Sequence, residues 1–311
     1  MSLTTVHDWR AATDAGEGGA VGPTSPTVAR RVLAQTLRDR RHELNLDVKT
    51  ITDRLGFSRN YWSAIENDRS LLAVDKLEIL FDLLEFDETE RDELRDLRQE
   101  ARKRGWWMEY PVLESEELKE VRRIYGLEAG AHHLQTFEGA IVTGLLQTEE
   151  YARAIISSDP VVSMVHVEQF VEIRMRRQKR LQSNTPLRLT SVMSEAALHQ
   201  EIGGPATLRN QLHHLVTMIT DLPNSIDLRV MPFSVTPGGI VGASTLCILD
   251  FQSQQLQPML WQESITAVGF IDESHKILQV RLSYEQALER SLSREASLDL
   301  VERRVQGLIQ R

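Results

Sequence analysis

The stretch LDVKTITDRLGFSRNYWSAIEN, residues 46–67, contains two short helical patterns separated by one glycine, Gly56. Asp47 is a suitable N-cap for the first helix, which we expect to end at Leu55, and Ser58 is a suitable N-cap for the second. Helices this short are unstable alone in water. The pattern therefore predicts two helices that pack on each other and on neighbouring helices.

Helical patterns on both sides of this stretch complete a small domain. Apolar residues recur at helical intervals from Thr27 to about Leu44, before the stretch. After it, we expect a fourth helix at 77–84 and a fifth, mostly charged, at 87–104. Five short helices, with the second and third joined through a glycine turn, describe a helix-turn-helix DNA-binding domain. We place this domain at residues 27–104.

The third helix carries the residues that we expect to read DNA. Its exposed side begins with small and hydrogen-bonding residues, and a helix N-terminus also favours phosphate. Arginine pairs with guanine through two hydrogen bonds, and asparagine pairs with adenine in the same way. Trp62 and Ile65 lie on the opposite side and are predicted to be core. The predicted DNA-binding residues on this helix are Ser58, Arg59, Asn60, Ser63 and Ala64.

Three further cations complete the predicted DNA-binding set. Arg38 and Arg41 on the first helix are candidates for phosphate contacts. They could equally be solvated, or pair within the helix with Asp39 or Glu43. Lys49, on the second helix, is the third predicted contact.

The distribution of charge agrees with this placement. The chain has a formal net charge of −9, which at first argues against a nucleic-acid partner. Residues 27–70, however, contain nine Lys/Arg and six Asp/Glu, a balance of +3, and the remainder has a balance of −12. A local anion-binding face on an acidic body is thus expected.

The composition limits the classes of protein to which the chain can belong. The 311 residues are 41% hydrophobic and 26% charged, typical of a soluble chain with two domains. We find no membrane-spanning window and no secretory signal, and the single cysteine, Cys247, cannot form an intrachain disulfide or a zinc site of CxxC pairs. We expect a cytoplasmic, nucleoid-associated protein, with Cys247 in the core.

The rest of the chain predicts a second, larger domain. Residues 1–26 have the composition of a flexible arm, and we place a linker at 105–115. Residues 116–311 should form an α+β domain with one central sheet. Helices are expected at 116–135, 148–158, 164–182, 195–219 and 272–309. The strand-like runs are FEGAIV, LRLTSVM, IDLRVMPF, STLCILDF, QPMLWQE and TAVGF.

Two resemblances to known families follow from these motifs. Residues 33–67 resemble the Xre, lambda-repressor-like family, with matches that include Leu55, Gly56, Ser58 and Glu66. They depart from its pattern at Asp47 and Val48, where Ser-Gln is usual. Segments such as TGLLQTEEYARAI, EIRMRRQKRL and SVMSEAALHQEIGG resemble the WhiJ-like regulators of actinobacteria. This second resemblance implies transcriptional control, commonly beside a small partner protein that antagonises the regulator.

Four residues of the larger domain are candidates for binding a partner or ligand. Arg174 and Arg177 belong to the charge run RMRRQKR, which could instead be a solvated helix face paired with nearby glutamates. Glu195 and Glu263 follow strand-like runs, where a carboxylate can do acid–base chemistry or simply satisfy backbone donors. Adjacent histidines, such as His213 and His214, point about 100° apart on a helix and do not predict a metal site. We expect no cofactor.

The function that these patterns favour is sequence-specific transcriptional regulation of double-stranded DNA. Because one small helix-turn-helix domain reads few bases, a homodimer is expected. The larger domain would be modulated by a partner protein or ligand. Two alternatives remain open: an enzyme or toxin-like larger domain under control of its DNA-binding domain, and a module for protein interaction alone. We expect that the chain is not an enzyme, because no convergent polar site can be assembled from the sequence.

Overall fold

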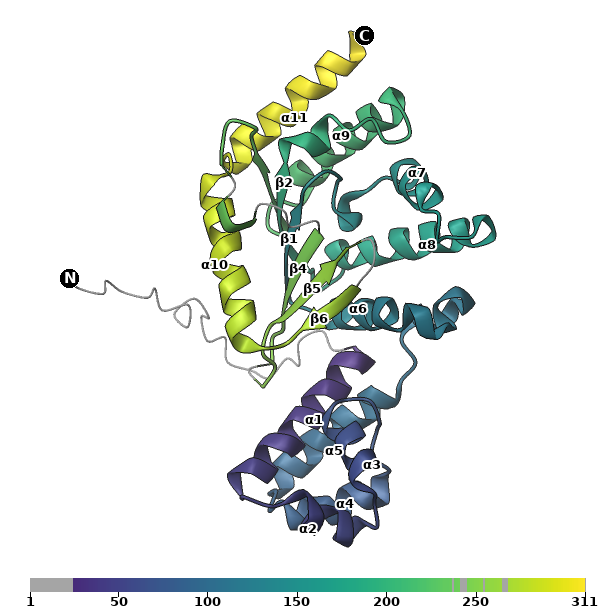
Figure 1. Cartoon of the computed structure of the whole chain (residues 1–311), viewed down its shortest axis with the longest axis vertical. Helices are drawn as coiled ribbons and strands as arrows, with labels where there is room; N and C mark the ends of the chain where they lie inside the picture. Colours follow the sequence, from purple (N-terminus) through teal and green to yellow (C-terminus); the bar gives the residue numbers. More distant parts are fainter. Residues whose placement is uncertain (1–24, 237, 241–244, 254, 265–267, 311) are drawn as a thin grey trace, which may run out of the picture.

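The computed structural model describes residues 25–236, 238–240, 245–253, 255–264 and 268–310. The predicted arm lies outside the described residues, apart from Ser25 and Pro26. Figure 1 shows two units: a helical N-terminal unit, residues 25–102, and a larger sheet unit, residues 103–310. The predicted α+β fold, with a five-helix domain followed by a domain with one sheet, is confirmed.

Five α-helices build the N-terminal unit. Their buried apolar faces enclose one core, which contains Leu37, Ile51, Leu55, Trp62, Ile65, Leu77, Leu80 and Phe81. Trp62 and Ile65 are therefore core residues, as predicted. The helices are α1 Pro26–Glu43, α2 Val48–Leu55, α3 Arg59–Glu66, α4 Val74–Leu83 and α5 Glu88–Arg102.

Short-range signals fix the ends of these helices. The side chain of Asp47 accepts a hydrogen bond from the backbone N–H of Thr50 at 2.6 Å, and so caps α2. Asp87 and Glu90 form a reciprocal capping box at the start of α5. Gly56 ends α2 in the left-handed conformation, with φ of 72°, which a residue with a β-carbon adopts only at a cost.

The segment predicted as a linker is compact rather than extended. It forms two short 3₁₀-helices, η2 Trp106–Glu109 and η3 Pro111–Glu114, followed by η4 Glu116–Leu118. Trp107, Tyr110 and Leu113 are buried in the core of the sheet unit. These large apolar side chains hold the connection between the two units against the sheet unit.

One mixed sheet forms the centre of the sheet unit. Within the described residues its strand order is β3-β2-β1-β4-β5-β6. Strands β1, β2 and β3 run parallel, whereas β4, β5 and β6 each pair antiparallel with the preceding neighbour in the sheet. The strands are β1 His133–Glu138, β2 Arg188–Ser194, β3 Ile226–Met231, β4 Thr245–Asp250, β5 Met259–Glu263 and β6 Val268–Ile271.

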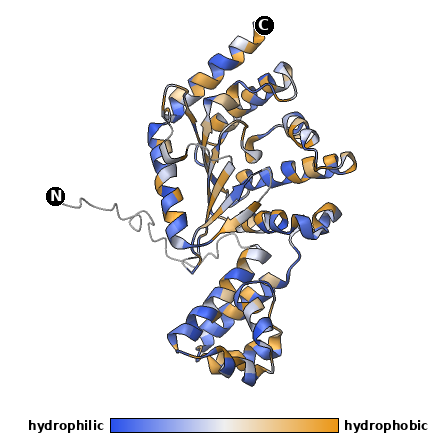
Figure 2. Ribbon diagram, in the orientation of Figure 1, coloured by the Kyte–Doolittle hydropathy of each residue, from blue (hydrophilic) through white to orange (hydrophobic). Residues whose placement is uncertain are grey.

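Helices cover both faces of this sheet (Figure 1). One face packs against α6 Lys119–Gly130, α8 Val167–Gln178, α9 Pro205–Asp221 and α11 Arg294–Ile309. α7 Glu149–Ser158 lies beside α8 and buries Tyr151 in the same core. The other face packs against α10 Ser274–Arg290. Figure 2 shows the apolar colouring concentrated in the strands and in the inward stripes of the helices. Apolar side chains on alternate faces of the strands therefore pack into two separate cores, one on each side of the sheet.

Several predicted boundaries in this unit were wrong. The helix expected at 116–135 ends at Gly130, because His133 already begins β1. The first strand was expected at FEGAIV, but β1 ends at Glu138, immediately before Gly139. The long helix expected at 272–309 is two helices, α10 and α11, separated by a break at residues 291–293.

The two units meet where α1 lies against α6. The hydroxyl of Ser25, the N-cap of α1, donates a hydrogen bond to the carbonyl oxygen of Gly126 at 2.5 Å. A β-carbon on Gly126 would lie 2.1 Å from the side-chain oxygen of Thr27, and one on Gly130 would lie 2.6 Å from Val28. Both glycines thus permit a close approach of the helices that no other residue allows.

Candidate nucleic-acid interface

The third helix of the N-terminal unit is short and firmly anchored. Ser58 caps it by accepting a hydrogen bond from the N–H of Tyr61 at 3.2 Å. Trp62 and Ile65, buried at 0% and 2% exposure, fix its inner side in the core. This anchoring leaves the opposite side of α3 turned outward at a defined angle, as recognition of a DNA groove requires.

The structure places the predicted DNA-reading residues together on that outer side. Ser58, Arg59, Asn60 and Ser63 are exposed, and Ala64 is half-buried. Neither side chain of Arg59 and Asn60 has a hydrogen bond or ion pair with another described residue. Their donors are therefore available for an external partner. Whether these residues contact DNA stays a prediction.

Ser63 has a neighbour that restrains it. The side-chain amide of Asn67 donates to the carbonyl oxygen of Ser63 at 2.7 Å and to its hydroxyl oxygen at 3.3 Å. The hydroxyl proton of Ser63 is left to donate elsewhere. Asn67 thus orients a residue of the predicted interface, and sequence reasoning did not single it out.

The turn before α3 is also held in place. The ammonium group of Lys76 donates to the carbonyl oxygen of Leu55 at 3.0 Å and lies 5.7 Å from the ring centre of Phe57. Phe57 meets Tyr61 edge to face, with ring centres 4.8 Å apart. The interactions of Lys76 with the end of α2 fix the path of the chain into α3.

Three cations predicted to contact DNA have different surroundings. Lys49 is exposed and pairs with Asp53 at 2.5 Å, which raises the pKa of Lys49. Arg38 is half-buried and donates to the side chain of Gln35. Arg41 instead pairs with Glu66 of α3, and donates to the carbonyl oxygen of Leu46 at 3.2 Å. The structure therefore gives Arg41 a bracing role inside the unit.

The charge run at 174–180 is largely turned inward, unlike the solvated face that was one expectation. Both oxygens of the buried Glu128 accept hydrogen bonds from Arg177, at 2.8 Å and 2.6 Å. Arg174 donates to the side-chain oxygen of Gln147 at 2.5 Å, and burial lowers the pKa of Arg174. The run thus ties α8 to α6 and to the loop after β1.

Glu263 belongs to a polar row at one end of the sheet. Glu138, Thr245 and Glu263 are direct cross-strand partners on β1, β4 and β5. Glu138 is 4% exposed and accepts a hydrogen bond from the hydroxyl of Thr245 at 2.9 Å, and burial raises its pKa to about 8. Glu138 was missed from the sequence, because FEGAIV was interpreted as an apolar strand.

Glu195 lies apart from this row. One of its oxygens accepts a hydrogen bond from the backbone N–H of Phe233 at 2.8 Å, and the other lies 3.7 Å from the His199 ring. It therefore joins the ends of β2 and β3, as a carboxylate that satisfies a backbone donor. Among the described residues, Glu195 shares no hydrogen bond or ion pair with Arg174, so the structure does not join these two candidates.

Two further features are absent from the residues that the structure describes. No group of three or more His, Cys, Asp or Glu side chains is arranged there to hold a metal ion. None of the helices in the described ranges has the length and apolar character that a membrane crossing requires. Cys247 lies on β4, partly buried, and burial raises the pKa of its thiol.

Comparison with family models identifies the class of protein and then the family. Residues 32–94 match the model described as a helix-turn-helix domain, so the chain is a DNA-binding regulator of the helix-turn-helix class with a C-terminal domain of unknown function. Residues 121–303, more than half of the chain, match the model described as a domain of unknown function, DUF5753; the chain belongs to this family. No curated protein and no solved structure matches the chain.

Proposed function

We propose that this chain is a sequence-specific transcription regulator of the Xre type, which binds double-stranded DNA as a homodimer. The observation that carries the proposal is the pair Arg59 and Asn60 at the start of α3. Both are exposed without a partner among the described residues, while Trp62 behind them is fully buried. Arginine and asparagine at these positions suit guanine and adenine, respectively.

Dimerisation is proposed from the requirements of specificity. An eight-residue helix contacts few base pairs, so one copy discriminates poorly against the excess of non-specific sites in a genome. Two copies that bind two half-sites multiply this discrimination. The acidic balance outside residues 27–70 also restrains non-specific binding to DNA. A cytoplasmic, nucleoid-associated location follows from this role.

We propose that the sheet unit modulates DNA binding, through a ligand or a small antagonist protein, and is not an enzyme. The hydrogen bonds near the sheet end support this choice. Glu138 accepts a hydrogen bond from Thr245, and Arg174 donates one to Gln147, so each of these groups already has a partner within the protein. An acid–base function of Glu138 is the alternative that its raised pKa favours. Replacing Glu138 by Gln keeps the shape of the side chain. If the sheet unit only binds a ligand or a partner protein, this change should leave DNA binding unchanged.

The test is a genome-wide pull-down of the tagged protein crosslinked to DNA. The double variant Arg59→Ala/Asn60→Ala is compared with Arg102→Ala, an exposed arginine at the far end of α5. Sharp peaks that share two half-sites should be present for the wild type and Arg102→Ala, and lost in the double variant. Peaks that survive in the double variant would show that α3 does not read the sequence.

A further inference from the structure

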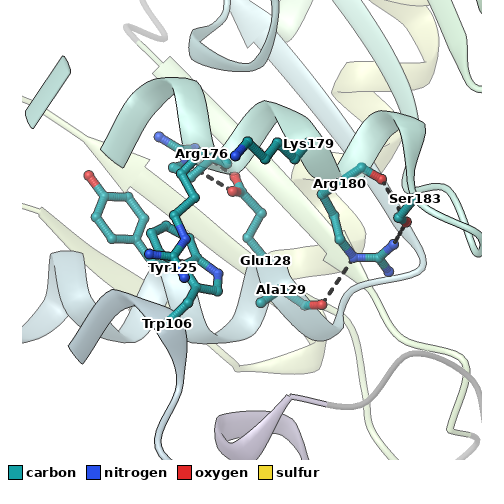
Figure 3. Close-up of a pocket in the computed structure, with 9 residues that line it drawn as sticks. Trp106, Tyr125, Glu128, Ala129, Arg176, Lys179, Arg180 and Ser183 are labelled. Carbon is teal, nitrogen blue, oxygen red and sulfur yellow. Dashed lines mark hydrogen bonds and ion pairs between the residues drawn. The ribbon is translucent and has the colours of Figure 1, made fainter. Parts of the chain in front are cut away.

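A cavity of about 260 Å³ lies between α6 and the end of α8, outside the predicted DNA-binding face. Figure 3 shows Glu128 and Ala129 of α6 facing Arg176, Lys179 and Arg180 across it. The segment that follows the N-terminal unit supplies Trp106. The lining residues are Trp106, Tyr125, Glu128, Ala129, Arg176, Arg177, Lys179, Arg180 and Ser183.

The lining is strongly cationic in an otherwise acidic protein. Arg177 is neutralised by Glu128, and Arg176 by Glu109, which lies outside the lining, through contacts of 2.6 Å and 3.0 Å. Arg180 donates to carbonyl oxygens, including those of Ala129 and Ala131 at 3.1 Å and 3.2 Å, and these do not cancel its charge. Glu128 also attracts Arg180, but it already pairs with Arg177. The four cations of the lining therefore keep two net positive charges after Glu128 and Glu109 are counted.

The guanidinium groups are held rigidly at this cavity. The guanidinium of Arg176 lies 4.9 Å from the ring centre of Trp106, and that of Arg177 lies 4.8 Å from the ring centre of Tyr125. The two rings are nearly parallel, with an interplanar angle of 20°. Cations fixed on aromatic faces lose little freedom when an anion arrives, so the site is preorganised.

We propose that this cavity binds a small phosphorylated metabolite, and that binding is signalled to the DNA-binding unit. A phosphate monoester carries about two negative charges at pH 7, which matches the two net positive charges of the lining. Arginine forks and a lysine are the residues that bind phosphate oxygens most effectively. A hollow of this volume accepts a small molecule, whereas a protein partner would need a much larger face.

The position of the cavity supplies the link to DNA binding. Trp106 follows α5, the last helix of the N-terminal unit, by a few residues. Helix α6 presents Tyr125, Glu128 and Ala129 to the cavity, while Gly126 on the same helix contacts Thr27 of α1. A ligand that shifts α6 or Trp106 must therefore shift the contact between the units. This regulatory step rests on the proposed function as a DNA-binding regulator.

The binding step is tested by calorimetry on the full chain with three phosphate monoesters: adenosine 5′-monophosphate, glucose 6-phosphate and phosphoserine. Adenosine and inorganic phosphate serve as comparison arms. At least one ester should bind, and Lys179→Glu should weaken it about tenfold or more by reversing a charge at the phosphate. Lys276→Glu, on the opposite face of the sheet, should leave binding unchanged. Inorganic phosphate that binds as tightly as the ester would support the anion site and identify free phosphate as its ligand.

The binding step would be overturned by no heat with any phosphate up to millimolar concentration, or by binding that Lys179→Glu leaves intact. Adenosine binding as tightly as its monophosphate would also overturn it. The regulatory step is measured separately, as the affinity for an operator fragment with and without the ester, in the wild type and in Lys179→Glu. An ester that binds but leaves DNA affinity unchanged overturns regulation alone. Ester binding by a chain that binds no DNA would overturn the proposed function instead.

Discussion

The Nε atom of Arg41 on α1 lies 2.6 Å from the Oε1 atom of Glu66 at the end of α3. The two side chains are only 11% and 10% exposed, so this ion pair is shielded from water. The pair therefore fixes the C-terminal end of the helix whose N-terminal end is predicted to read DNA.

Replacing Glu66 by Ala should destabilise the protein by about 1–3 kcal/mol, because it leaves the guanidinium of Arg41 partly buried and without its counter-charge. The change is measured as the free energy of unfolding in urea. Asp53→Ala is the matched control, since it removes an ion pair with Lys49 whose side chains are 66% and 63% exposed. That control should change stability by less than about 0.5 kcal/mol. If the two variants lowered the free energy of unfolding equally, the ion pair of Arg41 with Glu66 would not brace the unit.

The local signals around α2 and α3 explain why this unit could be predicted from sequence. Asp47, Gly56 and Ser58 each act within four residues of their own position, so no knowledge of the rest of the chain was needed. The same holds for the inward pattern of Trp62 and Ile65. The bracing of Arg41 by Glu66 joins residues far apart in sequence, and only the folded chain reveals it.

The candidate sites of the sheet unit depend on such distant contacts almost entirely. Arg177 looked like part of a solvated charge run, since its partner Glu128 is 49 residues away and belongs to another helix. Glu138 and Glu263 lie on either side of Thr245 only through the register of β1, β4 and β5. Sequence patterns predicted a sheet here, but strand order and register are set by packing between elements.

Lys49 and Asn60 should contribute to DNA binding in different ways. Lys49 is exposed at the side of the interface, so Lys49→Ala should weaken binding to all DNA sequences. The slope of log affinity against log salt concentration should fall by about one, because one fewer counterion is released. Asn60→Ala should instead cost about 1–3 kcal/mol at one base position and relax specificity there. Both effects are measured by titrating operator and scrambled fragments at several salt concentrations.

The contrast between the two variants is the informative result. If Lys49→Ala altered the preference between operator and scrambled DNA, Lys49 would be a base-reading residue. If Asn60→Ala weakened both fragments equally, α3 would contact only the DNA backbone.

Glu138 should make stability fall as pH rises. Burial raises its pKa to about 8 in the folded protein, whereas an exposed glutamate titrates near 4.5. The folded state thus holds an extra proton between these values, and stability decreases as pH rises from about 4.5 to about 8. Glu138→Gln cannot ionise, so its stability relative to the wild type should increase over this range, by a few kcal/mol in order of magnitude.

The measurement is the free energy of unfolding of both proteins at pH 5.5 and pH 8. Taking the difference between variant and wild type removes the contribution of other groups, including His133, whose pKa burial lowers to about 4. Glu302→Gln, an exposed position on α11, should show no pH-dependent difference. A constant difference between Glu138→Gln and wild type would mean that Glu138 titrates normally.

Gly126 and Gly307 form a natural pair for testing the contact between the units. Both lie within helices, so replacing either with Ala should gain about 0.5–1 kcal/mol of helix propensity. A β-carbon on Gly307 meets no atom within 4 Å, and Gly307→Ala should show this gain as increased stability. On Gly126 the same carbon would lie 2.1 Å from Thr27 of α1 and 2.9 Å from the Trp107 ring, so something must move.

Gly126→Ala should therefore lose about 1–3 kcal/mol despite its better helix propensity, because the added carbon separates α6 from α1. Urea unfolding measures the loss, and limited proteolysis should show faster cleavage between residues 103 and 118, where the separated units expose the connecting segment. Thr27→Ala in the same chain removes the nearest obstructing atoms and should recover part of the stability. If Gly126→Ala and Gly307→Ala stabilise equally, α1 and α6 are not in contact in solution, and the path from the cavity to α1 through α6 is lost with it.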